Sequence, residues 1–334
     1  MANTSSHLPS LAPAGAPLIG IARLAAHGEH IRAGHNVEYL TLEARTLLSR
    51  CTSPRMPFQW TINPYRGCEF GCKYCYARYT HEFMELRDGV EFERRIYVKQ
   101  NAAWLLRRDL KKLKPGEQIA IGAATDPYQP AERRYGVTRA ILEELARHRG
   151  LDFGLITKSD LILRDLDLFC EISAHNQLSL HITITTLSAH LARLLEPRAP
   201  RPDLRLRALA ELAKAGLDVG VSCAPVLPGI TDSAAALEAV VKAASGSGAR
   251  FIHANALFLK PCSAAVFMPF LEKQFPHLST AYKQRYGERA YASAAYQNRI
   301  SRLLSKFRAK YGFNSRRQRR APVQRPAADQ LALF

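Results

Sequence analysis

The sequence predicts an α/β fold built from parallel βα units. Six apolar, β-prone runs recur along the chain and amphipathic stretches of helical period lie between them. The 47% hydrophobic content of the 334 residues is ordinary for a protein that buries a core. Strands that alternate with helices pair in parallel, either wrapped as a barrel or laid out as an open sheet, and periodicity does not distinguish the two. In both arrangements the functional groups gather at the carboxyl ends of the strands.

The predicted elements alternate regularly along the chain. The strands are expected at residues 58–65, 118–123, 151–157, 179–185, 217–223 and 250–258. The helices are expected at residues 99–113, 137–148, 161–174, 203–215 and 232–244. Gly216 is placed to end the fourth helix, one face of which can hold Leu204, Leu206, Leu209, Leu212 and Ala213. From residue 263 onward the strand pattern stops, and helical or irregular segments continue to about residue 311.

Composition divides the chain into four segments. Residues 1–50 are expected to form a partly disordered N-terminal extension, 51–260 the βα body, 261–312 a C-terminal extension, and 313–334 a basic disordered tail. No apolar run approaches the length that crosses a bilayer, and the first twenty residues lack the basic start and apolar core of a secretory signal. We therefore expect a cytoplasmic protein with no membrane partner.

The net charge of +18 is concentrated near the C-terminus, where residues 289–328 hold eleven Lys or Arg and no acidic residue. Such a segment attracts polyanions by releasing counterions from phosphates, which favours nucleic acid as a partner. A solubilising tail, or a patch that faces an acidic protein, is the alternative. Tyr311 and Phe313 lie among these cations and are candidates for stacking on bases. The alternative is a helix that docks on the body through Leu303, Leu304 and Phe307.

Three of the seven cysteines lie within eight residues. Cys68, Cys72 and Cys75 form a C-x3-C-x2-C pattern on a loop that leaves the first predicted strand. Gly67 and Gly71 let this loop curl so that three thiolates face one centre. Three thiolates leave one iron of a [4Fe–4S] cube without a protein ligand, and that iron can bind a small chelating molecule.

A zinc site and a chance spacing are the alternatives to an iron–sulfur site. Structural zinc takes a fourth ligand at matching spacing, and His81 is the only histidine near the three cysteines. A disulfide framework is disfavoured, because the number of cysteines is odd and a cytoplasmic compartment is reducing.

The C-x3-C-x2-C pattern resembles the signature of the radical S-adenosylmethionine (SAM) superfamily. The resemblance covers roughly residues 55–260 and implies a partial (β/α)6 TIM-like barrel of the radical SAM type, which matches the six predicted strands. It also implies a [4Fe–4S] cluster held by Cys68, Cys72 and Cys75, with SAM bound to the open iron through its amino and carboxylate groups. Electron transfer from a reductant such as flavodoxin or ferredoxin then cleaves SAM and yields a 5′-deoxyadenosyl radical.

Further stretches resemble one branch of the superfamily, the relatives of spore photoproduct lyase. These stretches are GAATDPYQPAE, LITKSDLILRDLDL, TITTLSAHLARLLEPRAP and GVSCAPVLPGITD. The resemblance implies that Tyr76 lies near the adenine of SAM and that Lys158 neutralises its carboxylate. It places Thr125, Asp126 and Thr183 near the methionine and ribose ends. The structural alternatives are a rim charge for Lys158, a turn cap for Asp126 and a strand-filling role for Thr183.

One departure from this branch bears on the reaction. In true spore photoproduct lyases the stretch that matches GAATDP carries a cysteine that gives a hydrogen atom to the product radical. This chain has Ala123 and Ala124 there, so the sequence does not predict photoproduct repair by that mechanism. Cys223 ends the fifth predicted strand and is a candidate catalytic residue, with a buried small hydrophobe as its alternative role. The weaker candidates are Cys51, Cys170 and Cys262.

The chain ends in QLALF, which resembles the short bacterial QLxLF motif that docks into the β sliding clamp of the replicative polymerase. The matching residues are Gln330, Leu331, Leu333 and Phe334. Together these features predict a radical SAM enzyme, lyase-like or modifying, that acts on nucleic acid in DNA repair or modification. The competing hypotheses are a radical SAM enzyme that acts on a peptide or small metabolite, and a non-catalytic metal-stabilised adaptor.

Overall fold

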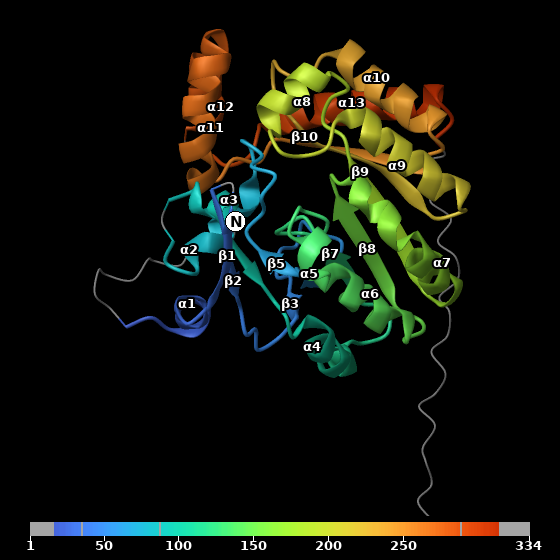
Figure 1. Ribbon diagram of the computed structural model, residues 1–334. Helices are drawn as coiled ribbons and strands as arrows, with labels where there is room; N and C mark the ends of the chain where they lie inside the picture. Colours follow the sequence, from blue (N-terminus) through green and yellow to red (C-terminus); the bar gives the residue numbers. More distant parts are fainter. Residues whose placement is uncertain (1–16, 35, 87, 288, 314–334) are drawn as a thin grey trace, which may run out of the picture.

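The computed structural model describes residues 17–313 except 35, 87 and 288. Two β-sheets are present in this part of the chain (Figure 1). The larger sheet has the strand order β11-β10-β9-β8-β7-β4-β3. Its strands are β3 (Leu48–Arg50), β4 (Trp60–Ile62), β7 (Gln118–Ile121), β8 (Asp152–Thr157), β9 (Gln177–Thr183), β10 (Val219–Val226) and β11 (Phe251–Ala256). The six strands from β4 to β11 pair in parallel, and each one coincides with a predicted strand.

The order of these strands distinguishes the two possible α/β arrangements. From β4 to β11 the order in the sheet follows the order in the chain without a reversal. A doubly wound open sheet reverses its order at a switch point, whereas a βα barrel winds in one direction. Strand β3 extends the sheet antiparallel to β4, and within the described residues the terminal strands β3 and β11 do not pair with each other. The fold is therefore a partial (β/α)6 barrel, as predicted.

Helices connect the parallel strands at the predicted places. They are α4 (Ala102–Asp109), α5 (Glu132–Tyr135), α6 (Val137–Ala146), α7 (Leu166–His175), α8 (Ala189–Leu195), α9 (Pro202–Lys214) and α10 (Ala234–Gly246). Local signals set their ends. Gly216, with a φ of +82°, follows α9, and the Ser233 side chain accepts a hydrogen bond from the Ala236 N–H at the start of α10. The two helices expected at 99–113 and 161–174 contain 3-10 turns at 110–112 and 160–165, and α5 and α8 were not predicted.

The predicted strand at 58–65 is divided between two sheets. After β4, Pro64 has no N–H for a ladder, and the chain continues into β5 (Tyr65–Arg66) of the smaller sheet. This second sheet has the order β1-β2-β6-β5 and was not predicted from the sequence. Its other strands are β1 (His30–Gly34), β2 (Val37–Thr41) and β6 (Arg95–Val98), beside the helices α1 (Gly20–Ala26), α2 (Tyr79–Glu82) and α3 (Glu91–Arg94).

The C-terminal extension is helical, as predicted. It consists of α11 (Pro261–Gln274), α12 (Ser279–Tyr286) and α13 (Ala294–Lys310), and α13 packs against β11 and α10 (Figure 1). Leu304 and Phe307 are buried on α13, so the docking-helix alternative is confirmed. The proposed base-stacking role of Phe313 is wrong, because Phe313 is buried. Tyr311 is half-buried and its hydroxyl donates to Glu238 at 2.9 Å. No helix of the described residues has the length and apolar character that a membrane crossing requires.

Candidate active site

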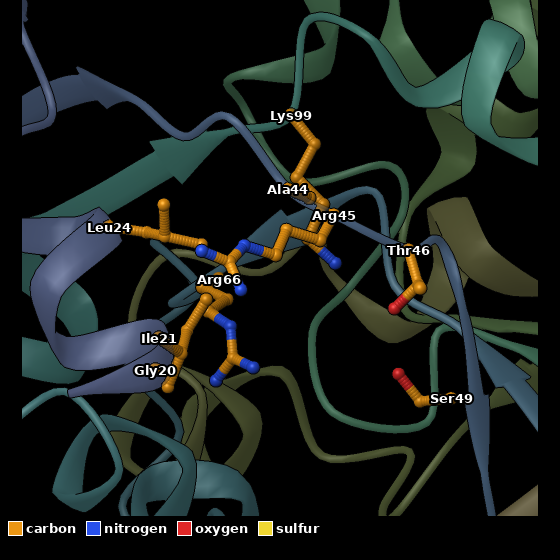
Figure 2. A pocket seen from close by; sticks show the side chains of 9 residues that line it. All are labelled: Gly20, Ile21, Leu24, Ala44, Arg45, Thr46, Ser49, Arg66 and Lys99. Carbon is orange, nitrogen blue, oxygen red and sulfur yellow. The ribbon is translucent and has the colours of Figure 1, made fainter.

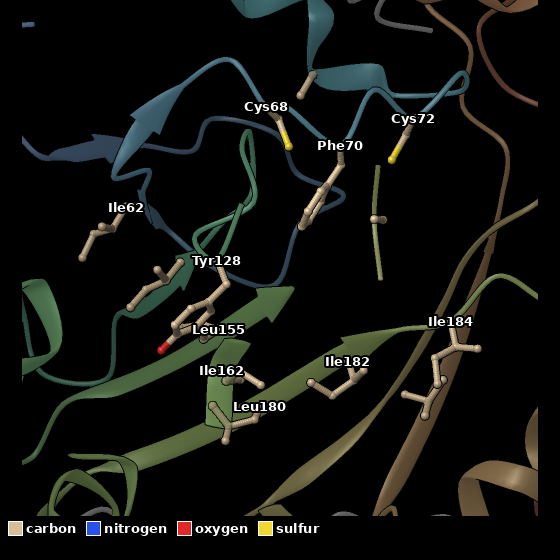
Figure 3. Close-up of a cluster of buried hydrophobic side chains, with 14 of the residues drawn as sticks. Ile62, Cys68, Phe70, Cys72, Tyr128, Leu155, Ile162, Leu180, Ile182 and Ile184 are labelled. Carbon is tan, nitrogen blue, oxygen red and sulfur yellow. The ribbon is translucent and has the colours of Figure 1, made fainter. Parts of the chain in front are cut away.

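The three clustered cysteines lie on the loop between β5 and a 3-10 turn at Tyr76–Arg78. Cys68 and Cys72 are buried and Cys75 is half-buried. Figure 3 shows the side chains of Cys68, Phe70 and Cys72 pointing to the same side of this loop, toward the barrel strands. The loop therefore presents at least two of its thiols to the interior of the barrel.

Gly67 and Gly71 shape this loop as the sequence predicts. Both have left-handed backbone conformations, with φ values of +84° and +64°. A Cβ at Gly67 would lie 2.6 Å from the Arg95 carbonyl oxygen, and one at Gly71 would collide with the carboxylate of Glu93. Only glycine fits these positions without strain.

Hydrogen bonds to main-chain carbonyls fix the cysteine loop. The Gly67 oxygen accepts from the Thr125 hydroxyl at 2.6 Å, and the Cys72 oxygen accepts from the Arg78 guanidinium at 3.0 Å. At the end of the loop, the Cys75 oxygen accepts from the Ser263 hydroxyl at 2.8 Å. These bonds tie both ends and the middle of the loop to the rest of the protein.

The environment of the thiols suits a cationic cluster. Burial, together with the charges of Asp126, Cys72 and Cys75, raises the pKa of the Cys68 thiol well above its usual range. Burial likewise raises the pKa of Cys72 to about 12, despite the nearby Lys158. The cysteines raise one another's pKa values, so their thiols lie close together. Iron would supply the positive charge that thiolates need in such a site.

The spacing of these side chains does not suit a single metal ion. Within the described residues, no three Cys, His, Asp or Glu side chains converge closely enough to hold one ion. A cubic cluster requires less convergence, because each cysteine binds a different iron. His81, the nearest histidine, is buried and its Nε2 faces the Arg95 carbonyl oxygen at 3.1 Å. Burial lowers the pKa of His81 to about 4, so it is a neutral core residue.

Lys158 follows β8 and is close to the cysteine loop. Its Nζ lies 5.7 Å from the centre of the Tyr74 ring. Burial alone would lower the pKa of Lys158. The charges of Cys72 and Glu196 outweigh burial and hold this pKa above its usual value, which keeps the side chain cationic. The structure therefore brings Lys158 together with Cys72, as the predicted site requires.

Asp126 supports Lys158 through the backbone. Its carboxylate accepts hydrogen bonds from the Thr157 hydroxyl at 2.6 Å and from the Lys158 and Tyr128 N–H groups at 2.7 and 2.9 Å. These bonds join the loops that follow β7 and β8. The bond from Tyr128 is the turn cap of the structural alternative, and the bonds from Thr157 and Lys158 fix the backbone at Lys158.

A buried charge network beside Cys72 was missed in the sequence. Arg205 and Glu196 are both about 1% exposed, and their Nη2 and Oε2 atoms are 2.5 Å apart. The Tyr74 hydroxyl also donates to Glu196. Burial alone would raise the pKa of Glu196. The charges of Arg205 and Lys158 outweigh burial and hold this pKa below its usual value. One signal was available: Arg205 lies on the buried face of α9 with Ala208, Leu209 and Leu212, where a cation needs a partner.

The remaining predicted cofactor residues surround the same loop. Tyr76 is 41% exposed and its hydroxyl donates to the Ala123 carbonyl oxygen. The buried Thr125 hydroxyl accepts from Gln129 at 2.9 Å in addition to its bond to Gly67. Thr183 is buried at the end of β9, and its carbonyl oxygen accepts from Arg205 at 3.0 Å. Thus Tyr76, Thr125 and Thr183 all lie at the carboxyl end of the barrel or on loops that adjoin it.

The other cysteines lie apart from this arrangement or deep in the core. Cys223, in β10, is 2% exposed within the hydrophobic core, and burial raises the pKa of its thiol to about 12. Cys170 is exposed, whereas Cys51 and Cys262 are half-buried. Gln330, Leu331, Leu333 and Phe334, together with the rest of the basic tail from 314, lie outside the described residues.

Comparison with known proteins agrees with this geometry. Residues 62–239 match the model of the radical SAM superfamily. An uncharacterized protein of Mycobacterium tuberculosis is 34% identical over 260 residues, which cover 76% of each chain. An uncharacterized protein of Methanocaldococcus jannaschii is 29% identical over 196 residues, 59% of this chain and 70% of its own.

Solved structures of spore photoproduct lyase have the same fold. One complex with dinucleoside spore photoproduct superposes with a TM-score of 0.60 at 15% identity and covers 82% of this chain and 79% of its own. A variant with bound AdoMet and the same dinucleoside gives equal values. Members of this superfamily are enzymes that use a [4Fe–4S] cluster and SAM. The family match, the relatives and the fold agree: this chain belongs to the radical SAM superfamily.

Proposed function

We propose that this radical SAM enzyme acts on nucleic acid, in DNA repair or modification. Cys68, Cys72 and Cys75 hold the [4Fe–4S] cluster in this proposal, and Lys158 binds the carboxylate of SAM. When bound and reduced by a donor such as flavodoxin or ferredoxin, the cluster and SAM supply a 5′-deoxyadenosyl radical. Asp126 orients Lys158, and Tyr76, Thr125 and Thr183 line the space for the rest of SAM.

The observation that supports a nucleic-acid substrate is an exposed group of aromatic and cationic side chains, here called the aromatic surface. It consists of Phe258 and Tyr291 with Arg55 and Lys260, and it meets the proposed SAM site at Tyr76. Tyr76 and Tyr291 are each 41% exposed. The surface adjoins the candidate site, since Tyr76 follows the third cysteine and Phe258 follows the carboxyl end of β11.

The geometry of the aromatic surface suits unpaired bases. The rings of Phe258 and Tyr291 stack with centres 4.3 Å apart, and the Tyr76 ring lies 6.3 Å from Phe258. The Arg55 guanidinium lies 4.0 Å from the centre of the Tyr291 ring, on the face away from Phe258, so a base that stacks on Tyr291 would replace Arg55 there. Single-stranded nucleic acid binds by stacking bases on such rings while cations neutralise phosphates. The solved spore photoproduct lyase complexes show that the fold accommodates a dinucleoside.

The reaction differs from that of spore photoproduct lyase in its source of hydrogen. Ala123 and Ala124 occupy the stretch where the lyase-like pattern carries a cysteine. We propose Cys223 as the first thiol to test, because it lies in the barrel strand β10 and its thiol is protonated at neutral pH. If Cys223→Ala leaves product formation unchanged, the hydrogen comes from another group.

The aromatic surface can be tested by oligonucleotide binding. Tyr291→Leu should weaken single-stranded DNA binding by about 1–3 kcal/mol, the value of one base stacked on an aromatic ring. The assay is fluorescence anisotropy with full-length protein over a salt series. Normal SAM cleavage by the variant would show that it folds.

A matched control is available on α4. Trp104 is 62% exposed on α4, and the Arg108 guanidinium lies 5.3 Å from its ring centre. Trp104→Leu therefore removes an aromatic–arginine pair of the same kind without altering the aromatic surface. Equal losses for both variants, or no DNA binding at low salt, would reject the nucleic-acid proposal in favour of a peptide or small metabolite substrate.

We also propose that the C-terminal QLALF sequence recruits the enzyme to the β sliding clamp. Leu333 and Phe334 are suited to an apolar pocket and Gln330 to a hydrogen bond at its edge. Because a short peptide loses conformational entropy on binding, we expect an affinity on the order of micromolar. A labelled peptide of residues 321–334 is titrated with purified clamp, beside a peptide with Leu333 and Phe334 changed to Ala. Absent binding, or equal binding of both peptides, contradicts the proposal.

A further inference from the structure

A small pocket lies between the N-terminal segment and the smaller sheet and shares no residue with the aromatic surface. Its volume is about 240 Å³. It lies beneath α1 and beside the loop after β2, and residues of β3 and β5 complete it. The nine residues that line it are Gly20, Ile21, Leu24, Ala44, Arg45, Thr46, Ser49, Arg66 and Lys99 (Figure 2).

Three cations gather in this pocket. Lys99 is 7% exposed, and its Nζ donates to the Asn63 carbonyl oxygen at 2.6 Å. The Arg66 Nη1 donates to the Thr80 carbonyl oxygen at 3.3 Å, but its Nε is buried with no hydrogen-bond partner. Arg45 is exposed at the pocket margin, and Figure 2 shows its side chain near those of Arg66 and Lys99.

No carboxylate balances these charges. None of the nine lining residues is acidic. In the part of the chain that the structure describes, neither Arg66 nor Lys99 forms an ion pair. Burial and the charge of Arg66 together lower the pKa of Lys99 to about 7. Buried cations side by side destabilise the protein unless an anion or a compensating hydrogen bond is supplied. The carbonyl hydrogen bonds of Lys99 and Arg66 compensate part of this cost, and an anion in the pocket would supply the opposite charge.

The lining and size of the pocket suit a phosphate group. Arg45 offers an exposed guanidinium, Lys99 offers an ammonium group, and the hydroxyls of Thr46 and Ser49 can donate further hydrogen bonds. Guanidinium and ammonium groups together are the usual ligands of phosphate oxygens. At about 240 Å³ the pocket is smaller than the roughly 300–1,000 Å³ of pockets that enclose whole ligands of drug size.

We propose that the pocket formed by Arg45, Arg66 and Lys99 is a binding site for a single phosphate group. The remainder of a phosphorylated ligand would lie outside the pocket. The phosphate belongs either to a nucleic-acid backbone or to a small phosphorylated molecule, because both present the same oxyanion. The site is separate from the aromatic surface, and its existence does not depend on the proposed substrate.

The test titrates full-length protein with inorganic phosphate at pH 6.5, with sodium chloride holding the ionic strength constant. Isothermal calorimetry measures the affinity. Lys99→Met should weaken phosphate binding about tenfold or more, the loss expected for one charged hydrogen bond. Arg45→Ala, at an exposed position that does not endanger folding, should also weaken it. Lys111→Met is the control, because Lys111 is exposed and outside the pocket.

The outcomes separate the proposal from its alternatives. No phosphate binding by the wild-type protein, or equal affinity in the wild type, Lys99→Met and Arg45→Ala, would overturn it. A short DNA oligonucleotide then identifies the source of the phosphate. If Lys99→Met also weakens oligonucleotide binding and phosphate competes with the oligonucleotide, the group is a backbone phosphate. If only phosphate binding is weakened, the ligand is a small phosphorylated molecule.

Discussion

Replacing Lys99 by Met should change how the stability of the protein depends on pH. The pKa of Lys99 is lowered to about 7 in the folded state, mainly by burial and further by Arg66. The unfolded chain keeps the ordinary lysine pKa near 10.4. Between these two values the unfolded state binds one more proton than the folded state, so the stability of the wild type rises with pH. Lys99→Met has no proton to release and lacks this contribution.

The size of this stability difference follows from the width of the pH range between the folded and unfolded pKa values of Lys99. Each pH unit within it is worth about 1.4 kcal/mol, so from pH 7.5 to 9.5 the wild type should gain roughly 2.5 kcal/mol relative to Lys99→Met. Urea unfolding in phosphate-free buffers measures both proteins, and subtraction removes titrations that they share. A difference that stays constant with pH would refute the reasoning. Saturating phosphate should reduce the slope, because a bound anion raises the pKa of Lys99.

Three further results are expected at the candidate site. Cys72→Ala should abolish both the binding of about four irons per chain and SAM cleavage after anaerobic reconstitution, and full cleavage by this variant would exclude Cys72 as a ligand. Lys158→Ala should weaken SAM binding by roughly 1.5–3 kcal/mol in equilibrium dialysis with iron content unchanged, and unchanged affinity would make Lys158 a rim charge. Arg205→Met should cost about 3–5 kcal/mol in urea unfolding, because Glu196 is left as a buried unpaired charge. Adding Glu196→Gln should recover part of that loss, and failure to recover any would show that the pair is not coupled.

The parallel strands of the larger sheet could be predicted because each is marked by a pattern in its own residues. Runs such as 151–157 and 179–185 are apolar, β-prone and bounded by helical patterns, and they became β8 and β9. The smaller sheet could not be predicted in this way. Strand β1 is short and largely exposed, and β2 pairs with β6, more than fifty residues along the chain. Such strands depend on non-local partners that no local pattern reveals.

The candidate site also has a part that could be predicted from the sequence and a part that could not. The cysteine spacing is local, so the sequence reveals it directly. The partners of Cys72 are not local: Lys158, Glu196 and Arg205 converge on it from the loop after β8, the end of α8 and the buried face of α9. The phosphate pocket likewise joins Arg66 to Lys99, which are separated by a loop, two short helices and a strand. Residues of this kind are found only once the topology is known.

The hydrogen bonds that hold the cysteine loop have a consequence for the order of assembly. They are supplied by Arg78 close by, by Thr125 in the loop after β7, and by Ser263 in α11. A nascent chain that has not yet reached Ser263 already contains all three cysteines, but it lacks the last of the groups that position them. Iron that met such a chain would find flexible thiols with no defined geometry. Cluster insertion is therefore expected to follow synthesis of the whole barrel and the first C-terminal helix, and chains truncated before residue 261 should be poor acceptors of iron.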